Sequence, residues 1–194
     1  MRPPKPNYNV FLIDLPGILA PKDREGIAAI LKSYFDPAAR GAGYSASSVT
    51  WQTDCPLVGD EELLIYFVTD YRDSVLMESV PPDMGAMTYS TSETGSEVYI
   101  RDAAGVDQIY PVLANLAFHE ALHNKTHLDD GGLHPTGGLA GPWVTAATRM
   151  TPAVLDLLTR SLPAKHRQFT GGCAGYGLAT RAYLVPSTPR QTVE

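Results

Sequence analysis

The sequence predicts an α+β fold: a mixed sheet of four to five strands, an N-terminal helix, a central helix that carries a His-Glu-x-x-His motif, and a C-terminal helix. Three observations predict it. Short apolar runs of strand length are bounded by turn residues, and longer segments repeat apolar residues at three- and four-residue spacing. These segments follow one another as strand, helix, three or four strands, helix, loop and helix.

Length and composition predict one folded domain. The chain has 194 residues, and 44% of them are hydrophobic, which is ordinary for a globular protein that buries a core. A globally disordered chain would be poorer in apolar residues and richer in charge. We therefore expect a single domain over residues 1–194, with its core at about 9–163 and an irregular tail at 164–194.

Five segments are expected to form strands. Residues 63–69 are the clearest, because they hold one continuous run of aliphatic and aromatic side chains. Residues 85–90 and 97–101 are expected as two strands with a turn at 91–95 between them. The remaining two are 9–15, which a Pro-Gly pair ends, and 47–53.

The first two helices are expected at residues 21–35, where Pro37 stops the apolar pattern, and in a longer segment after the strands. The longer helix is expected to begin between Asp107 and Pro111, because proline is tolerated in the first turn, and to run to about Leu128. Gly131-Gly132 then provides its end.

The last helix is expected after a loop rich in Gly and Pro that extends to Arg149. Thr151 is a suitable N-cap, and Pro152 suits the first helical position. Apolar residues at helical spacing continue from there to Leu162.

Charge and hydropathy limit the partners and the location. The net charge of −6 argues against duplex nucleic acid or an anionic membrane as the main partner, and the longest apolar run, residues 63–68, is too short to span a bilayer. Asp14 and Pro16 interrupt the first apolar stretch, so no export signal is visible, and we expect a cytoplasmic protein or release by a non-classical route. Cys55 and Cys173 allow one disulfide or two buried thiols.

The most informative stretch is His119-Glu120-Ala121-Leu122-His123, inside the long predicted helix. Two histidines four residues apart on a helix differ by only about 40° in direction and rise by about 6 Å, so both imidazoles can point at one ion. Glu120 lies on the flank of the same face, where a carboxylate can take a proton from a metal-bound water. This combination makes water a nucleophile near neutral pH.

A structural alternative is that His119 and His123 are ordinary hydrogen-bonded histidines of the core or its edge. Val112 and Leu116 share the histidine face, so this helix is expected to be buried. Burying two histidines and a carboxylate without partners is costly, which favours the metal interpretation.

A catalytic zinc site needs a third protein ligand and an open fourth position. Apart from Glu194, no glutamate follows Glu120, which excludes metalloproteases whose third ligand is a downstream glutamate. His134 is the preferred candidate, because Asp130-Gly131-Gly132 predicts a helix stop and a reversal that brings the chain back over the ion.

The other downstream candidates rank below His134. Asp129 is second, because its use requires a helix break near Thr126, whose β-branched side chain resists positive φ. His127 lies about 12 Å along a continuous helix from His119, and it is a ligand only if the helix breaks early. Ordinary roles are also expected: a turn for Asp129 and Asp130, a solvated helix face for Asp156 and a basic surface loop for His166.

This motif resembles that of the metzincin clan of zinc metallopeptidases, which carry HExxHxxGxxH or a final Asp, then a methionine turn beneath the metal and a final helix. Here Gly131-Gly132-Leu133-His134 is similar to the Gly-x-x-His half, displaced by five residues, and Met150 precedes the last predicted helix. At the clan's strict spacing, Thr126 stands at the glycine position and Asp129 at the third ligand. The resemblance covers about residues 9–163 and implies a zincin fold, a zinc cofactor and Glu120 as general base.

Met150 also has an ordinary interpretation as core packing. A glycine-rich segment at 171–177 lacks the Lys-Ser/Thr ending of a phosphate-binding loop and is expected to be a close-packed loop. Within it, Tyr176 is a candidate donor to a tetrahedral intermediate. Cys173 lies downstream of the motif, whereas the cysteine ligand of peptide deformylases lies upstream.

The sequence thus predicts a zinc-dependent metallopeptidase in which His119, His123 and His134 hold Zn²⁺ and Glu120 is the general base. The sequence does not indicate which residues bind substrate; an extended peptide is expected along an edge strand, for which residues 97–101 are the candidate. We expect a monomer that acts on peptides or proteins, with neither nucleic acid nor membrane as a partner.

Three alternatives stay open. A zinc amidohydrolase acting on small amides would have a narrow, closed pocket. A zinc-stabilised binding or toxin-like module would have four protein ligands, with His127 or Asp129 as the fourth. A catalytically silent descendant would keep the motif without the activity.

Overall fold

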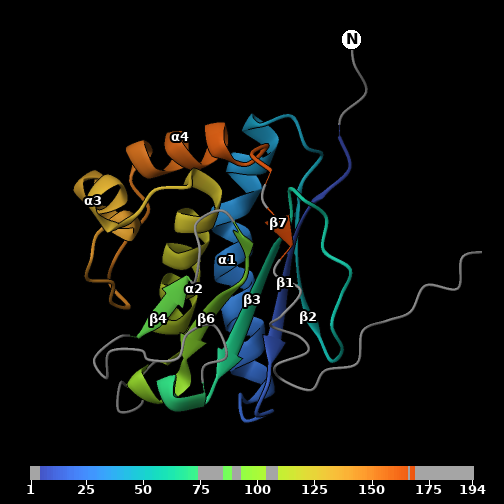
Figure 1. Ribbon diagram of the computed structural model, residues 1–194, viewed down its shortest axis with the longest axis vertical. Coiled ribbons are helices and arrows are strands. Elements are labelled where there is room, and N and C mark those ends of the chain that lie inside the picture. Colours follow the sequence, from blue (N-terminus) through green and yellow to red (C-terminus); the bar gives the residue numbers. More distant parts are fainter. Residues whose placement is uncertain (1–4, 74–84, 89–92, 104–108, 166, 169–194) are drawn as a thin grey trace, which may run out of the picture.

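Five strands form the main sheet of the protein, in the order β2-β1-β3-β6-β4 (Figure 1). They belong to a computed structural model, which describes residues 5–73, 85–88, 93–103, 109–165 and 167–168. The strands are β1 (Tyr8–Asp14), β2 (Ser47–Gln52), β3 (Leu63–Val68), β4 (Ala86–Thr88) and β6 (Ser96–Tyr99). Neighbouring strands pair in parallel except β4, which pairs antiparallel with β6. The predicted α+β fold with a mixed sheet is confirmed.

β3 is buried along its whole length because it lies at the centre of the sheet. Its side chains alternate between two apolar clusters: Leu63, Ile65 and Phe67 join the main core, and Leu64 and Tyr66 join a smaller cluster on the opposite face. A continuous apolar run is what a strand covered on both faces requires. A second, two-stranded parallel ladder joins β5 (Glu93–Thr94) to β7 (Arg167–Gln168).

The strand predicted at 97–101 is not at an edge. β6 lies between β3 and β4, so both of its sides are paired, and within the described residues β4 and β2 are the outer strands. The prediction that a peptide lies along 97–101 is therefore wrong. The sequence indicated a strand there but not its place in the sheet, which long-range pairing decides.

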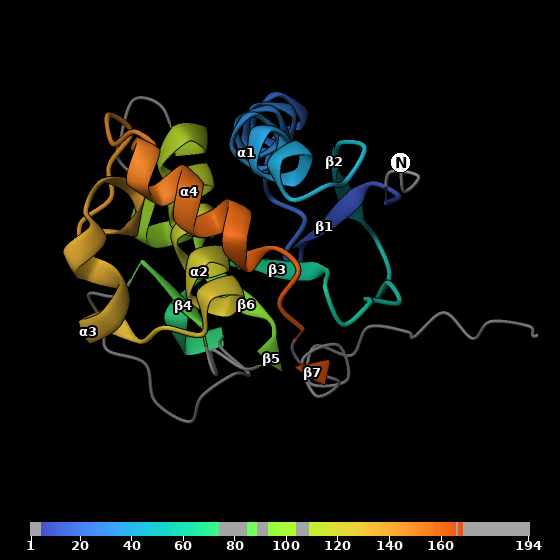
Figure 2. The same ribbon diagram turned by 90° about the horizontal axis from the view of Figure 1, so that it is seen from above.

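Three helices lie together on one side of the sheet (Figure 2): α1 (Pro21–Gly41), α2 (Ile109–Thr126) and α4 (Pro152–Ser161). The main core lies between these helices and the sheet, and it includes residues from every layer, among them Val10, Ile27, Phe118 and Leu158. No helix in the described part of the chain combines the length and the hydropathy needed to cross a bilayer.

α1 continues past the proline that was expected to stop it. Pro37 lies inside the helix, which ends only at Gly41. The reason is tertiary: Ala38 and Ala39 are fully buried in the main core, so the last turn is held by packing even though Pro37 cannot donate a backbone hydrogen bond.

α2 ends earlier than predicted. It stops at Thr126, and the next residue, His127, has a φ of 58°, which is the left-handed conformation that ends many helices. Gly131 and Gly132, expected to end α2, instead lie in a separate short helix, α3 (Asp130–Leu133). The prediction considered only Thr126 for the break, whereas histidine tolerates positive φ better than a β-branched residue.

The segment expected as loop between α2 and Arg149 contains short helical turns. α3 is followed by two 3₁₀ turns at His134–Thr136 and Gly138–Ala140. α4 begins as predicted: the Thr151 side chain accepts a hydrogen bond from the backbone N–H of Val154 at 3.2 Å, and Pro152 is the first helical residue.

Candidate metal centre

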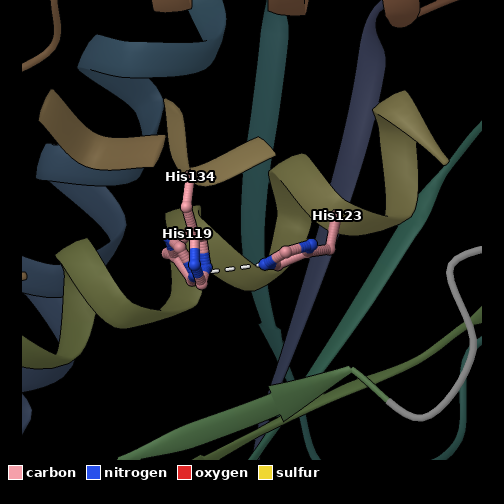
Figure 3. Close-up of side chains that lie close together, drawn as sticks. All are labelled: His119, His123 and His134. Atoms are coloured by element: carbon pink, nitrogen blue, oxygen red, sulfur yellow. Dashed lines mark hydrogen bonds between the residues drawn. The ribbon is translucent and has the colours of Figure 1, made fainter. Parts of the chain in front are cut away.

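α2 presents His119 and His123 on one face, four residues apart, deep in the protein. His119, Glu120 and His123 are all buried, and so are apolar residues of the same helix such as Phe118 and Leu122. The ring centroids of the two histidines are 4.8 Å apart, and their Nε2 atoms are 3.2 Å apart (Figure 3). The helical spacing therefore brings the two imidazoles together as predicted.

Backbone carbonyls orient both rings from behind. His119 Nδ1 lies 3.0 Å from the carbonyl oxygen of Leu139, and His123 Nδ1 lies 2.7 Å from that of Leu128. A carbonyl oxygen only accepts, so each Nδ1 carries the proton and donates it, and each Nε2 presents a lone pair inward. This arrangement is what metal-binding histidines show, where the outer nitrogen fixes the ring for the inner one.

The inward nitrogens are suited to a cation between them, because with both Nδ1 atoms protonated two lone pairs face each other at 3.2 Å. A proton is disfavoured there. Burial lowers the pKa of His119 to about 4 and also lowers the pKa of His123, so both rings are neutral at pH 7. Neutral imidazoles with free inner nitrogens are the form that binds transition metals.

The chain reversal after α2 brings a third imidazole to this pair. His127 ends the helix, and the side chain of Asp129 caps the short α3 by accepting a hydrogen bond from the N–H of Gly132 at 3.0 Å. His134 follows directly after α3. Its ring centroid lies 5.3 Å from that of His119 and 5.6 Å from that of His123.

Three ligand atoms, one each from His119, His123 and His134, lie within 4.8 Å of one another. Figure 3 shows the three rings converging on one space, two from α2 and one from the turn above it. Nε2 of His134 is buried and has no hydrogen-bond partner among the described residues, so a bound ion would supply the partner that it lacks. These three side chains can hold a metal ion.

The other candidate ligands lie elsewhere. Asp129 is used as the α3 cap, and His127 is exposed beyond the helix end. Asp156 forms a surface ion pair with Arg160 at 2.8 Å, in keeping with the solvated face predicted for it. Asp130, which was expected in a turn, is the first residue of α3 and lies at the rim of the histidine cluster. Its Oδ1 is 3.6 Å from His123 Nε2 and 3.5 Å from His134 Nε2.

Several residues of the sequence analysis lie outside the described residues: His166, Cys173, Tyr176, the segment 171–177 and Glu194. Cys55 is described and is buried beside Tyr66 in the smaller apolar cluster. Met150 is partly buried and packs against the main core. The loop that precedes Met150 is tied to α2, because the side-chain amide of Asn115 donates hydrogen bonds to the carbonyl oxygens of Thr145 at 2.6 Å and Thr148 at 3.3 Å.

Glu120 is buried beside the histidines, with 6% of its surface exposed. Burial raises the pKa of its carboxyl to about 8, and the hydroxyl of Thr88 acts in the opposite direction. A pKa near the working pH is suited to a group that accepts and returns a proton.

A polar network holds this part of α2 against the sheet. The Thr88 hydroxyl on β4 donates to the backbone carbonyl of Glu120 at 3.1 Å and lies 2.9 Å from the Ser96 hydroxyl on β6. Ser96 in turn donates to Asn124 at 3.1 Å, one turn further along α2. These contacts could not be predicted from the sequence, because they join segments that are distant along the chain.

No protein-family model and no curated protein matches the chain. The chemistry assigned to it therefore depends on the residues and geometry described above.

Proposed function

We propose that the protein is a zinc-dependent metallopeptidase in which His119, His123 and His134 hold the ion and Glu120 is the general base. The observation that carries the proposal is the convergence of three imidazoles, whose ligand atoms lie within 4.8 Å of one another, beside the buried carboxylate of Glu120 on α2. Three histidines with an open fourth position are a ligand set of catalytic zinc, although imidazole also suits copper, iron and nickel.

Zinc in this position supplies Lewis acidity, which polarises a carbonyl group and lowers the pKa of water to about 7. The residues of the chain do the rest. His119 and His123 keep their rings in place through the Leu139 and Leu128 carbonyls. Glu120 accepts the proton of the attacking water and passes it to the departing amine. A divalent cation beside it favours its ionised form, which opposes the effect of burial on its pKa.

An extended peptide is the substrate that the neighbouring strand favours. Within the described residues β4 is an outer strand, so its free side can pair with a further strand. Thr88 on β4 bonds to the backbone of Glu120, which places this strand directly beside the proposed base. An outer strand beside the proposed base supports a peptide, rather than a small amide, as the substrate.

A metzincin-like relationship is part of the proposal. The order of elements, with a mixed sheet, an active-site helix and a C-terminal helix, agrees with that clan, and so does the position of Met150 between the third histidine and α4. The third histidine is reached through the inserted α3 rather than at the clan's usual spacing.

Substitution of Glu120 by Gln tests the mechanism. We expect Glu120→Gln to bind zinc as the wild type does and to lose hydrolysis of an unfolded protein such as casein. Glu25→Gln, on the exposed face of α1, is the matched control and keeps full activity. Hydrolysis that survives Glu120→Gln removes Glu120 from the mechanism, and hydrolysis restricted to small amides favours the amidohydrolase alternative.

Metal analysis tests the ligand set. We expect one zinc ion per wild-type chain, a loss of zinc in His134→Ala, and retention of zinc in Asp129→Ala. A wild-type protein that binds no zinc would overturn the proposal. Zinc loss in Asp129→Ala but not in His134→Ala would make Asp129 the third ligand, at the spacing that is usual in the metzincin clan.

A further inference from the structure

Asp129 and Asp130 lie side by side near the histidine cluster, and only Asp129 caps α3, so the Asp130 carboxylate has no part in this cap. Asp130 is the first residue of α3, and its side chain is 82% exposed. Within the described residues, its carboxylate faces two of the three candidate metal ligands, His123 and His134.

The distances separate two explanations for this position. A charge-assisted hydrogen bond from a histidine to a carboxylate is about 2.7–2.9 Å long. Asp130 Oδ1 instead lies 3.6 Å from His123 Nε2 and 3.5 Å from His134 Nε2, and the latter nitrogen has no hydrogen-bond partner. The carboxylate is therefore close to both nitrogens without bonding to either.

The same distances fit atoms that share one ion. Around a tetrahedral zinc with bonds of about 2.0–2.1 Å, neighbouring donor atoms are roughly 3.3–3.4 Å apart. The two Nε2 atoms of His119 and His123, at 3.2 Å, have this separation, and Asp130 Oδ1 has nearly the same separation from His123 and His134.

From this geometry we infer that Asp130 is a fourth, displaceable ligand of the ion that His119, His123 and His134 hold. The inference rests on the proposed metal site. A fourth ligand that is buried would make the site structural. Asp130 is instead mostly exposed and belongs to a helix of four residues, so its carboxylate can leave when water or substrate takes the fourth position.

Asp130→Asn and Asp129→Asn are a matched pair for the test. Both remove one negative charge from adjacent exposed positions, and Asn at 129 keeps the helix cap. We expect Asp130→Asn to weaken zinc binding by about 10-fold or more, measured against a competing chelator, and to change the visible absorption of the Co²⁺-loaded protein, while Asp129→Asn changes neither. Acetohydroxamate, which needs open coordination positions, is expected to bind zinc-loaded Asp130→Asn more tightly than wild type.

Each other outcome has a separate meaning. Equal weakening in both variants shows that Asp130 acts through charge alone and overturns the inference, as does a Co²⁺ spectrum unchanged in Asp130→Asn. If the wild type binds neither Zn²⁺ nor Co²⁺, the proposed metal site itself fails. Circular dichroism of both variants establishes that they are folded, which is expected because both side chains are exposed.

Discussion

α1 and α2 pack against each other on the same side of the sheet, but they bury different kinds of residue (Figure 2). α1 buries one apolar face, made of Ile27, Leu31, Phe35, Ala38 and Ala39. α2 buries twelve of its eighteen residues, and six of those twelve are polar or charged: Asn115, His119, Glu120, His123, Asn124 and Lys125. The residues that α1 buries are thus all apolar, whereas α2 also carries polar groups into the core.

The polar residues buried on α2 carry an energetic cost that the apolar residues buried on α1 do not. Buried polar groups destabilise a fold unless they are paired. Most of those on α2 are paired with backbone: Asn115 with the loop before α4, and Lys125 with the carbonyl oxygens of Glu61 at 2.9 Å and Ala164 at 2.6 Å. The inner Nε2 atoms of His119 and His123 instead face each other at 3.2 Å, where the proposed metal ion would bind.

Removal of a histidine from α2 is expected to have the largest effect. If the roughly 10–16 kcal/mol of a four-ligand zinc site is shared evenly, one ligand is worth about 3 kcal/mol, so His123→Ala should weaken zinc binding by about 100-fold or more. His127→Ala, one turn further and exposed, is the control and should bind zinc normally. Competition with a chelating dye measures both, and equal affinities would show that α2 does not hold the ion.

Truncation in α1 should affect stability and leave the metal site intact. Leu31 is fully buried in the main core, so Leu31→Ala is expected to reduce the free energy of unfolding by about 3 kcal/mol. Urea unfolding measures this change. The zinc affinity of the folded variant should equal that of the wild type, and a parallel loss of affinity would mean that the two helices are not as separate as their burial indicates.

The pH dependence of the metal-free protein should reveal the charged groups of α2. The folded state keeps a proton on Glu120 up to its raised pKa of about 8, whereas the unfolded state loses it near pH 4.5, so the free energy of unfolding falls as pH rises. Below about pH 6.5 the lowered pKa values of His119 and His123 oppose this slope. The visible decrease is therefore expected between about pH 6.5 and 8, and it amounts to roughly 1–2 kcal/mol.

Lys125 should reverse the trend at higher pH. Burial lowers its pKa to about 8, so above that pH the unfolded state holds more protons and stability rises again. The metal-free protein should thus have a stability minimum near pH 8. In urea unfolding with a chelator present, Glu120→Gln should remove the falling limb and Lys125→Met the rising limb; a limb that persists in its variant contradicts the assignment.

The sequence predicted those parts of the fold that local pattern decides. Apolar runs and helical spacing located the five main strands and three helices, and Thr151-Pro152 located the start of α4. The helix boundaries that were wrong depend on tertiary packing: buried Ala38 and Ala39 carry α1 past Pro37, and α2 stops at His127. The place of 97–101 in the sheet depends on pairing between distant segments.

The candidate site was predictable to a similar degree. The spacing of His119 and His123 was enough to predict that their rings lie together. The chain reversal before His134 was also predicted at Asp130-Gly131-Gly132, although these residues form α3 and do not end α2. The carbonyls of Leu128 and Leu139 had no sequence signal, because any residue type has a carbonyl. Thr88 was missed, and Asp130 was considered only as a turn residue, because the contacts of both depend on positions in space.

Thr88 provides the smallest and most specific test of how α2 differs from α1. Thr88→Val keeps the shape of the side chain and removes its hydrogen bonds to the Glu120 carbonyl and to Ser96, so stability should fall by about 1 kcal/mol. The hydroxyl also lowers the pKa of Glu120, so its loss should raise that pKa and move the acidic limb of the pH–rate profile for peptide hydrolysis to higher pH. Thr88→Ser, which keeps the hydroxyl, should restore the wild-type profile. If Val and Ser behave alike, the hydroxyl does not tune Glu120, and β4 supports α2 by packing alone.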